Sequence, residues 1–255
     1  MNVREILEQL SSGELSVEQA ESHLAIAGIS ALEGFAQLDT GRHARKGVPE
    51  VIYATGKTTS QLTEICGIML EHTGRAIVSA LDRERLAALE DSFGPKLAVA
   101  SREAGMAVIR EPGREPKPTG GRLGILTAGT SDIPVAEQAR IVAEEMGCEV
   151  VAAYDVGVAG VHRLRQPLEQ MIGSRIAALV VAAGMEGALP SVVAGLVPVP
   201  VIGLPTSTGY GLGGKGVTAL LSMLQSCSPG LVVVNIDNGI GAGATAALIA
   251  NRSSA

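Results

Sequence analysis

The stretch that decides the fold is residues 199–250, VPVIGLPTSTGYGLGGKGVTALLSMLQSCSPGLVVVNIDNGIGAGATAALIA. Its pattern predicts, in order, a strand, a glycine loop, a helix, a second strand and a glycine turn before a last helix; the first four span Val199–Leu204, Thr206–Gly216, Val217–Ser226 and Leu231–Ile236. The loop holds five glycines in eleven residues, so its backbone N–H groups can approach a ligand closely. A flexible surface loop is the alternative, and Pro205 with the two flanking elements disfavours it.

The same alternation extends back to residue 122. Strands are expected over Arg122–Thr127, Glu149–Asp155 and Ala177–Ala182, and helices over Pro134–Met146, Leu164–Ile172 and Pro190–Val197. Repeated β–α units with apolar strands predict an α/β, flavodoxin-like, doubly wound parallel sheet, in which ligands bind beyond the carboxyl ends of the strands. Glycine-bearing turns follow four strands, at Ala128–Asp132, Ala183–Gly187, Thr206–Gly216 and Asn235–Gly243. We expect these four turns to meet at one rim.

Residues 1–111 predict a separate small α/β domain that begins with two helices. The expected elements are helices Val3–Leu10 and Ser16–Ala27, strand Val51–Ala54, helix Thr59–Glu71, strand Ala76–Ala80, helix Asp82–Phe93 and β runs Leu97–Ala100 and Ala107–Arg110. Proline and glycine crowd residues 112–121, which predicts a linker to a second domain over 122–255.

Composition limits the classes of function. The chain is 46% hydrophobic but only 2% aromatic, which suits a parallel sheet of small aliphatic residues covered by helices. A net charge of −6 argues against a nucleic-acid partner. The apolar runs are too short or too glycine-broken for a membrane partner, and the charged, helical N-terminus is unlike a secretion signal, so a cytoplasmic protein is expected. Three distant cysteines without CxxC spacing, and no histidine cluster, predict neither a disulfide framework nor a bound metal.

Single residues at the rim suggest chemistry, and each has a plainer alternative. The GTSD turn, Gly129–Asp132, offers N–H groups to a phosphate or carboxylate, or it only caps a helix. Glu186, between glycines at a strand end, suits a general base but equally an exposed loop glutamate. Cys227 follows a helix C-terminus, where the dipole gives no help to a thiolate, so the residues alone indicate a small buried side chain. Lys57 precedes a helix N-terminus and could hold a phosphate or simply be solvated; Val51 stands where a P-loop needs glycine.

Longer motifs in the carboxy-terminal half resemble the PurE-type aminoimidazole ribonucleotide carboxylases and mutases. GILTAGTSDIPVAEQA, AAGMEGALPSVVAGLVPVPVIGLPTS and NIDNGIGAGATAALIA match that family's GSxSD turn, glycine-rich segment ending in HLP, PVIGVP strand and AGxxNAA helix. Ala188 stands at the position of the family's histidine. The resemblance therefore implies the fold more strongly than the purine reaction.

Motifs along nearly the whole chain resemble the LarB family of pyridinium-3,5-biscarboxylic acid mononucleotide synthases, which act in nickel-pincer nucleotide biosynthesis. In order they are GRHARKGVPEVIYATGKT, AGTSD, AAGMEG, PTSTGYGLGGKG, MLQSCSPG and VVNIDNGIGAG. The resemblance implies an enzyme that carboxylates nicotinic acid adenine dinucleotide with CO₂ and hydrolyses its phosphoanhydride to release AMP. It makes Cys227 the nucleophile and Glu186 the base.

The glycine loops fit a dinucleotide that lies close to the backbone, and basic residues of the first domain are candidates for its phosphates and carboxylate. The expected substrate-binding residues are Gly129, Thr130, Ser131, Asp132, Gly184, Met185, Gly187, Gly209, Gly211, Asn235, Asp237, Arg42, Arg45 and Lys57. No tightly bound cofactor is expected, and a need for Mg²⁺ at the diphosphate is left open. PurE-type domains also imply a homo-octamer, for which the apolar helix Ala242–Ala250 is the support in the sequence. The alternatives are a PurE-type carboxylase or mutase and a dinucleotide-binding protein without catalysis.

Overall fold

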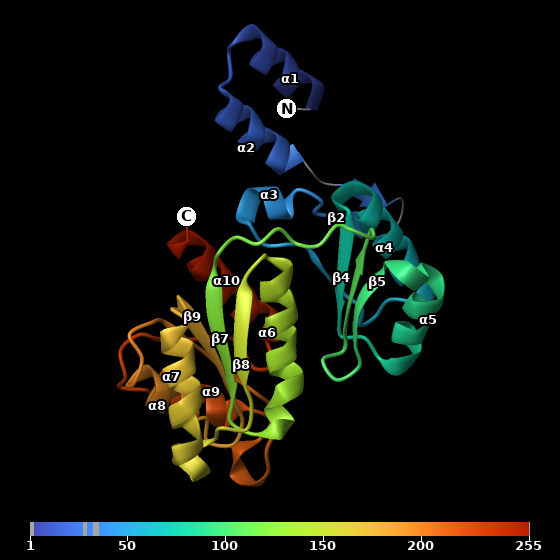
Figure 1. The fold of residues 1–255 in the computed structure, drawn as a ribbon. Helices are drawn as coiled ribbons and strands as arrows, with labels where there is room; N and C mark the ends of the chain where they lie inside the picture. Colours follow the sequence, from blue (N-terminus) through green and yellow to red (C-terminus); the bar gives the residue numbers. More distant parts are fainter. Residues whose placement is uncertain (1–2, 28–29, 33–35, 255) are drawn as a thin grey trace. The chain divides into compact units, whose positions relative to one another are not determined.

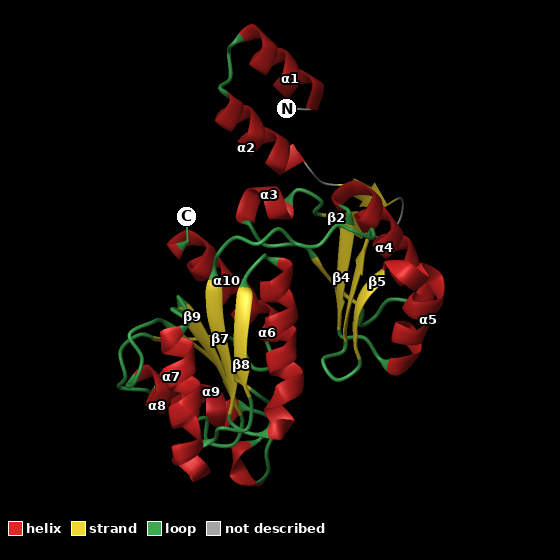
Figure 2. Cartoon of the chain, viewed as in Figure 1, coloured by secondary structure: helices red, strands yellow, loops and turns green. Residues whose placement is uncertain are grey.

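The computed structural model describes residues 3–27, 30–32 and 36–254 of the chain, which forms two compact units, Met1–Glu115 and Pro116–Ala255 (Figure 1). Figure 2 shows that both units combine helices with a sheet, which confirms the expected α/β class. Within the described part of the chain, no helix has both the length and the apolar character needed to cross a bilayer.

The second unit is built on a parallel sheet. Its strands are β7 (Arg122–Thr127), β8 (Glu149–Ala153), β9 (Ala178–Ala183), β10 (Val201–Pro205) and β11 (Leu231–Val233). They lie side by side in the order β11-β10-β9-β7-β8, and every pairing is parallel. This is the flavodoxin-like order, so the predicted doubly wound sheet is confirmed, with the crossover direction reversing beside β7.

Five α-helices cover this sheet. They are α6 (Ile133–Glu145), α7 (Arg165–Gly173), α8 (Leu189–Ala194), α9 (Val217–Leu224) and α10 (Gly239–Ser253), with short 3₁₀ turns at Thr130–Asp132, Val158–Leu164 and Gly211–Gly213. Helices α6 and α10 pack on each other and on the central strands. Side chains of α7, α8 and α9 form a separate apolar cluster with Leu126, Leu179 and Val181 on the other face. The central strands β7, β9 and β10 are therefore buried on both sides, as their apolar residues require, whereas the edge strands β8 and β11 are partly exposed.

The contact between α6 and α10 depends on glycine. A Cβ on Gly239 or Gly243 would collide with the backbone oxygens of Val135 and Ala139, so the two helices touch backbone to backbone. Alanines of α10 are buried in this contact, among them Ala242 and Ala246. Helix α6 of the same chain covers this face of α10, so the apolar character of the face is explained within one chain, and the octamer stays a prediction.

Three element boundaries differ from expectation for identifiable reasons. Helix α10 begins at Gly239 rather than near Ala242, because the Asn238 side chain caps it by accepting a hydrogen bond from the Gly241 N–H at 2.9 Å. Helix α8 ends at Ala194, before Gly195, and strand β11 ends at Val233, after pairing with β10 over three residues. The predicted spans of α8 and β11 were too long because apolar residues continue past the end of each element.

The first unit contains a smaller mixed sheet. Its strands β3 (Val51–Tyr53), β4 (Arg75–Ser79), β5 (Leu97–Ser101) and β6 (Met106–Arg110) lie in the order β3-β4-β6-β5. Only β3 and β4 pair in parallel, and the other two pairings are antiparallel. Helices α4 (Thr59–Thr73) and α5 (Arg83–Phe93) contribute to one apolar cluster with this sheet. Thr58 caps α4 through a capping box with Gln61.

The remaining elements of the first unit are short. They are helices α1 (Val3–Ser12), α2 (Val17–Ala27) and α3 (Arg42–Lys46), the 3₁₀ turn Gly94–Lys96, and the antiparallel pair β1 (Ser30–Leu32) and β2 (Ala36–Leu38). Ser16 caps α2, because its hydroxyl accepts a hydrogen bond from the Gln19 N–H at 3.2 Å. The two N-terminal helices were expected; α3 and the β1–β2 pair were not.

Candidate active site

A cavity of about 520 Å³ lies at the carboxyl ends of the parallel strands in the second unit. It is lined by the turns that follow β7, β8, β9 and β10. A volume of this size is typical of a site for a small organic ligand. The location follows the rule for doubly wound sheets, because the cavity spans the reversal of strand order beside β7.

Strand order, rather than chain order, decides which turns meet here. The turn after β8 joins the cavity because β8 lies next to β7, although it carries none of the expected site residues. Strand β11 lies at the far edge, so its turn with Asn235 and Asp237 does not line the cavity. Asp237 instead supports the glycine loop by accepting a hydrogen bond from the Ser207 N–H at 2.8 Å. The last glycine turn therefore meets its neighbour at the same end of the sheet, as expected, but it does not line the cavity.

Asp132 ties two of the lining turns together. Its side chain is buried, with 4% exposure, and Oδ1 accepts hydrogen bonds from the Thr206 hydroxyl at 2.5 Å and the Thr208 hydroxyl at 2.7 Å. Oδ2 accepts a hydrogen bond from the Gly129 N–H at 2.8 Å. The carboxylate thus fixes the GTSD turn against the glycine loop. It does not cap α6 with its side chain, so the plain capping role expected as the alternative is wrong for Asp132.

The turn after β9 brings a carboxylate to the cavity. Gly184 leaves space for the Thr208 backbone, which a Cβ would strike, and Met185 adopts the left-handed conformation at φ 50°. Glu186 follows on the exposed wall of the cavity. Exposure was the plainer expectation for this residue, and the cavity location is what a general base requires. The expected exposure is therefore confirmed, and the general-base role stays a prediction.

Cys227 is exposed, so the burial expected from the residues alone is wrong. It lies between α9 and β11, and the adjacent Ser228 hydroxyl donates a hydrogen bond to the Ser191 carbonyl of α8 at 2.8 Å. The residues around Cys227 are small, and apolar segments flank them, which is why burial was expected. Helix α9 ends three residues before Cys227, and the chain then turns through Ser-Pro-Gly at the surface, so the side chain is exposed. Cys227 does not line the cavity of its own chain.

The expected substrate-binding residues divide into three groups. Those lining the cavity are Gly129, Ser131, Asp132, Gly184, Met185 and Gly209. Those near it in sequence but outside its lining are Thr130, Gly187, Gly211, Asn235 and Asp237. Those of the first unit are Arg42, Arg45 and Lys57.

The three basic residues expected to bind the substrate all have partners within the first unit. Arg42 pairs with Glu50 at 2.9 Å, and Arg45 binds Asp39, which lowers the pKa of the Asp39 carboxyl. Lys57 donates a hydrogen bond to the Tyr53 carbonyl at 2.7 Å. Any phosphate bound by these side chains would compete with these partners.

Several cavity residues had not been singled out from the sequence. Arg163 and Tyr210 line the wall, and Thr208 lies at the base of the glycine loop. Tyr210 could have been predicted as a site residue, because an aromatic residue inside a glycine loop is unusual in a chain with 2% aromatics. Arg163 had no such signal, since it follows an ordinary run that was expected to lead into a helix.

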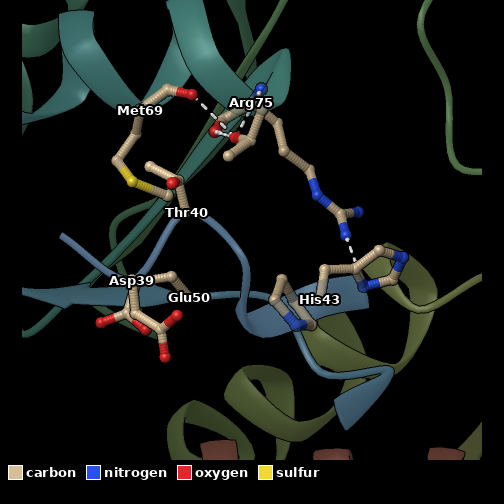
Figure 3. Close-up of a pocket in the computed structure, with 8 residues that line it drawn as sticks. Asp39, Thr40, His43, Glu50, Met69 and Arg75 are labelled. Carbon is tan, nitrogen blue, oxygen red and sulfur yellow. Dashed lines mark hydrogen bonds between the residues drawn. The ribbon is translucent and has the colours of Figure 1, made fainter. Parts of the chain in front are cut away.

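A much smaller hollow, of about 20 Å³, lies in the first unit beside α3 and β4 (Figure 3). Asp39, His43, Glu50 and Arg75 line it, and the Arg75 Nη2 lies 3.3 Å from the His43 Nδ1. Burial raises the pKa of the Glu50 carboxyl, although Arg42 opposes the shift. The hollow has room for about one water molecule, so it is no site for a nucleotide.

Comparison with known families follows these two units. Residues 122–255 match the family described as AIR carboxylase, and residues 30–111 match the family described as LarB/PurE-like N-terminal domain. An uncharacterised protein of Methanocaldococcus jannaschii is 44% identical over 252 residues, which cover 98% of this chain and 97% of the relative. The chain belongs to the LarB family.

Two further relatives match about half of the chain. The N5-carboxyaminoimidazole ribonucleotide mutases of M. jannaschii and Thermotoga maritima are 34% and 31% identical over 127 and 135 residues. These matches cover 49% and 50% of this chain and 74% of each mutase. The LarB-family chain is therefore an enzyme of the carboxylase or mutase type, with an added N-terminal domain.

Proposed function

We propose that this enzyme is a pyridinium-3,5-biscarboxylic acid mononucleotide synthase, acting in nickel-pincer nucleotide biosynthesis. It would convert nicotinic acid adenine dinucleotide, CO₂ and water to the biscarboxylated mononucleotide and AMP. The observation that carries the proposal is the exposed thiol of Cys227 in a chain whose other two cysteines, Cys66 and Cys148, are buried. A nucleophilic cysteine must be accessible, and this one is.

The chemistry requires a nucleophile because a pyridinium ring is electron-poor and does not attack CO₂. Addition of the Cys227 thiolate to a ring carbon forms a C–S bond and gives a neutral dihydropyridine, whose enamine carbon then attacks CO₂. Glu186 takes the proton from the newly carboxylated carbon. The electron pair left behind restores the aromatic ring as the C–S bond breaks and the thiolate leaves. Hydrolysis of the phosphoanhydride then releases AMP, with Mg²⁺ as a candidate co-ion on the diphosphate.

Assembly of chains is part of the same proposal, because Cys227 does not line its own chain's cavity. Helix α9 exposes Val217, Leu221 and Leu224 at helical spacing on one stripe, and this stripe leads to the Cys227 loop. Exposed apolar stripes of this kind mark interfaces. We propose the homo-octamer of the PurE-type domains, in which a neighbouring chain can bring its Cys227 loop toward a cavity.

The assembly is tested by light scattering on the purified protein. Leu221→Lys places a charge in the proposed interface and should yield smaller species. Leu196→Lys is a second exposed leucine outside α9, at 57% exposure against 59% for Leu221, and serves as the matched control. A wild-type protein that is monomeric at micromolar concentration would reject the octamer.

Mass spectrometry of products tests the activity. The protein is incubated with nicotinic acid adenine dinucleotide and ¹³C-labelled bicarbonate, and a labelled biscarboxylated mononucleotide plus AMP is expected. Cys227→Ser and Glu186→Gln should abolish labelling, whereas Glu169→Gln, an exposed glutamate on α7, should not. Carboxylation of aminoimidazole ribonucleotide instead would favour the mutase-type reaction of the partial relatives. No reaction with either compound would favour a binding protein.

A further inference from the structure

Tyr210 is the aromatic residue of the cavity. It lines the wall, and within the described part of the chain no other tyrosine or phenylalanine does. The sequence holds only three tyrosines, two phenylalanines and no tryptophan, so an aromatic side chain at this place stands out. Any stacking that this chain offers to a ring inside the cavity must therefore come from Tyr210.

The side chain of Tyr210 is almost uncovered by its own chain. It is 84% exposed, whereas the other two tyrosines, Tyr53 and Tyr154, are 59% and 37% exposed. Tyrosine combines a flat apolar face with a polar hydroxyl, and aromatic faces bind other planar rings in offset stacks. The Tyr210 ring thus has an open face at the wall of a ligand-sized cavity.

The backbone just before Tyr210 is anchored. The Thr208 carbonyl accepts a hydrogen bond from the Met185 N–H at 3.3 Å, and the Thr208 hydroxyl donates one to Asp132 at 2.7 Å. Gly209 has φ 134°, and a Cβ on it would lie 3.0 Å from the Met185 Sδ. The loop therefore packs directly on Met185, and Tyr210 follows from a fixed point.

The backbone after Tyr210 is built to turn and then anchor again. Gly211 has φ 79°, in the region that favours glycine. Gly216 closes the loop, since a Cβ on it would lie 2.8 Å from the Thr206 carbonyl oxygen. With both ends of the loop held, Tyr210 can adjust its ring to a ligand while its backbone stays at the cavity.

The anchor of Tyr210 lies next to the proposed general base. Met185, on which the loop packs, directly precedes Glu186, and both line the cavity. The dinucleotide of the proposed function has two planar rings, a cationic pyridinium and an adenine. The ring that loses a proton to Glu186 is the pyridinium, and the face of a tyrosine also attracts a cation.

We propose that Tyr210 stacks on the pyridinium ring of the ligand and holds it beside Glu186. The identity of the ring rests on the proposed function, whereas the stacking is measured by binding alone. The two proposals can therefore fail separately.

Calorimetric titration of the full-length protein tests the proposal with three probes: nicotinic acid mononucleotide, adenosine monophosphate and inorganic pyrophosphate. They present the pyridinium ring, the adenine ring and no ring. The variants are Tyr210→Ala, Tyr210→Leu and Tyr210→Phe, which remove the side chain, remove only its planar face, and keep the face. Leu212→Ala is the matched control, because Leu212 lies on the same loop, is fully exposed and does not line the cavity.

We expect Tyr210→Ala and Tyr210→Leu to weaken binding of nicotinic acid mononucleotide roughly 5- to 100-fold, as loss of an aromatic stacking partner does. Tyr210→Phe should stay within about threefold of wild type, because the face that stacks is kept. Leu212→Ala should bind this probe as wild type does. Adenosine monophosphate and pyrophosphate should bind equally to wild type and all variants.

Unchanged binding of nicotinic acid mononucleotide by Tyr210→Ala would overturn the proposal, as would a wild-type protein that does not bind this probe. A loss confined to adenosine monophosphate would also overturn it, because Tyr210 would then hold the adenine. Equal losses for pyrophosphate, or in Leu212→Ala, would show a disturbed loop instead of a lost stack. Smaller species of Tyr210→Ala in light scattering would place Tyr210 in a contact between chains and reject the ligand role.

Turnover separates this inference from the proposed function. Labelled product formed by Tyr210→Ala with wild-type KM and kcat leaves the proposed function standing and overturns the stacking role. Tyr210-dependent binding of nicotinic acid mononucleotide without any carboxylated product supports the stacking role and overturns the proposed function.

Discussion

Replacing Asp132 with alanine should reveal how strongly the cavity loops depend on one carboxylate. The substitution removes three hydrogen bonds, from Thr206, Thr208 and Gly129, at 2.5–2.8 Å. Hydrogen bonds to a charged group contribute about 1.5–3 kcal/mol each. The loss is smaller than their sum because the carboxylate no longer has to be desolvated, and because the two threonine hydroxyls, 2.7 Å apart, still bond to each other. We expect the free energy of unfolding to fall by about 2–4 kcal/mol.

Urea unfolding of the full-length protein, followed by circular dichroism, measures this change. Ser131→Ala is the matched control, since Ser131 is adjacent and exposed, and it should change the unfolding free energy by less than about 0.5 kcal/mol. In a Thr206→Val, Thr208→Val background, Asp132→Ala removes only the Gly129 hydrogen bond and should cost about 1–2 kcal/mol less than in wild type. An equal cost in both backgrounds would refute the network, because the threonines would then contribute nothing to the role of Asp132.

Three further results are expected. Iodoacetamide should modify Cys227 alone in the native protein, as read by peptide mass spectrometry, because burial protects Cys148 and raises the pKa of the Cys66 thiol to about 12; equal labelling of all three would contradict the assignment. Gly184→Ala should weaken dinucleotide binding at least tenfold by pushing Thr208 aside, whereas Gly173→Ala, whose Cβ would meet open space, should bind as wild type does. Burial and the hydrogen bond to Glu137 raise the pKa of Tyr154 to about 12. The stabilising contribution of Tyr154 is therefore present below pH 10 and is lost as the pH rises through about 12. Ultraviolet titration of the wild type against Tyr154→Phe measures this, and a Tyr154 that ionises together with the other tyrosines would disprove it.

The sheet and most helices of the second unit were predictable because local signals agree there. Each strand is mostly apolar, and each is followed by a turn and a helical pattern, so alternation alone indicated a parallel sheet. The start of the last helix was mispredicted because glycine is typical of turns but also occurs where two helices pack closely. Gly239 and Gly241 read as a turn in the sequence, yet they form the first turn of α10, because Asn238 caps it and α6 needs a residue without a side chain at Gly239.

The candidate site was only partly predictable, because no single segment of the sequence indicates which strands lie next to each other in the sheet. The GTSD turn and Glu186 were found through their position at strand ends. Arg163 was missed because it reaches the cavity only through β8 lying beside β7, which no local pattern indicates. The exposure of Cys227 was missed because a cysteine after an apolar helix is usually buried, and only the tertiary fold shows that the chain leaves the core there.

The glycine contact between α6 and α10 also has a consequence for how the molecule opens. Two helices in backbone contact over a fully buried sheet leave no room for water to reach their amides without separating the pair. Amide hydrogen exchange should therefore be slowest in α6, α10 and the strands β7 and β9 beneath them, and should approach the rate of global unfolding there. The turns that line the cavity lie outside this slowest-exchanging block, so their amides should exchange faster than those of the block, with the Asp132 hydrogen bonds limiting how freely two of them open.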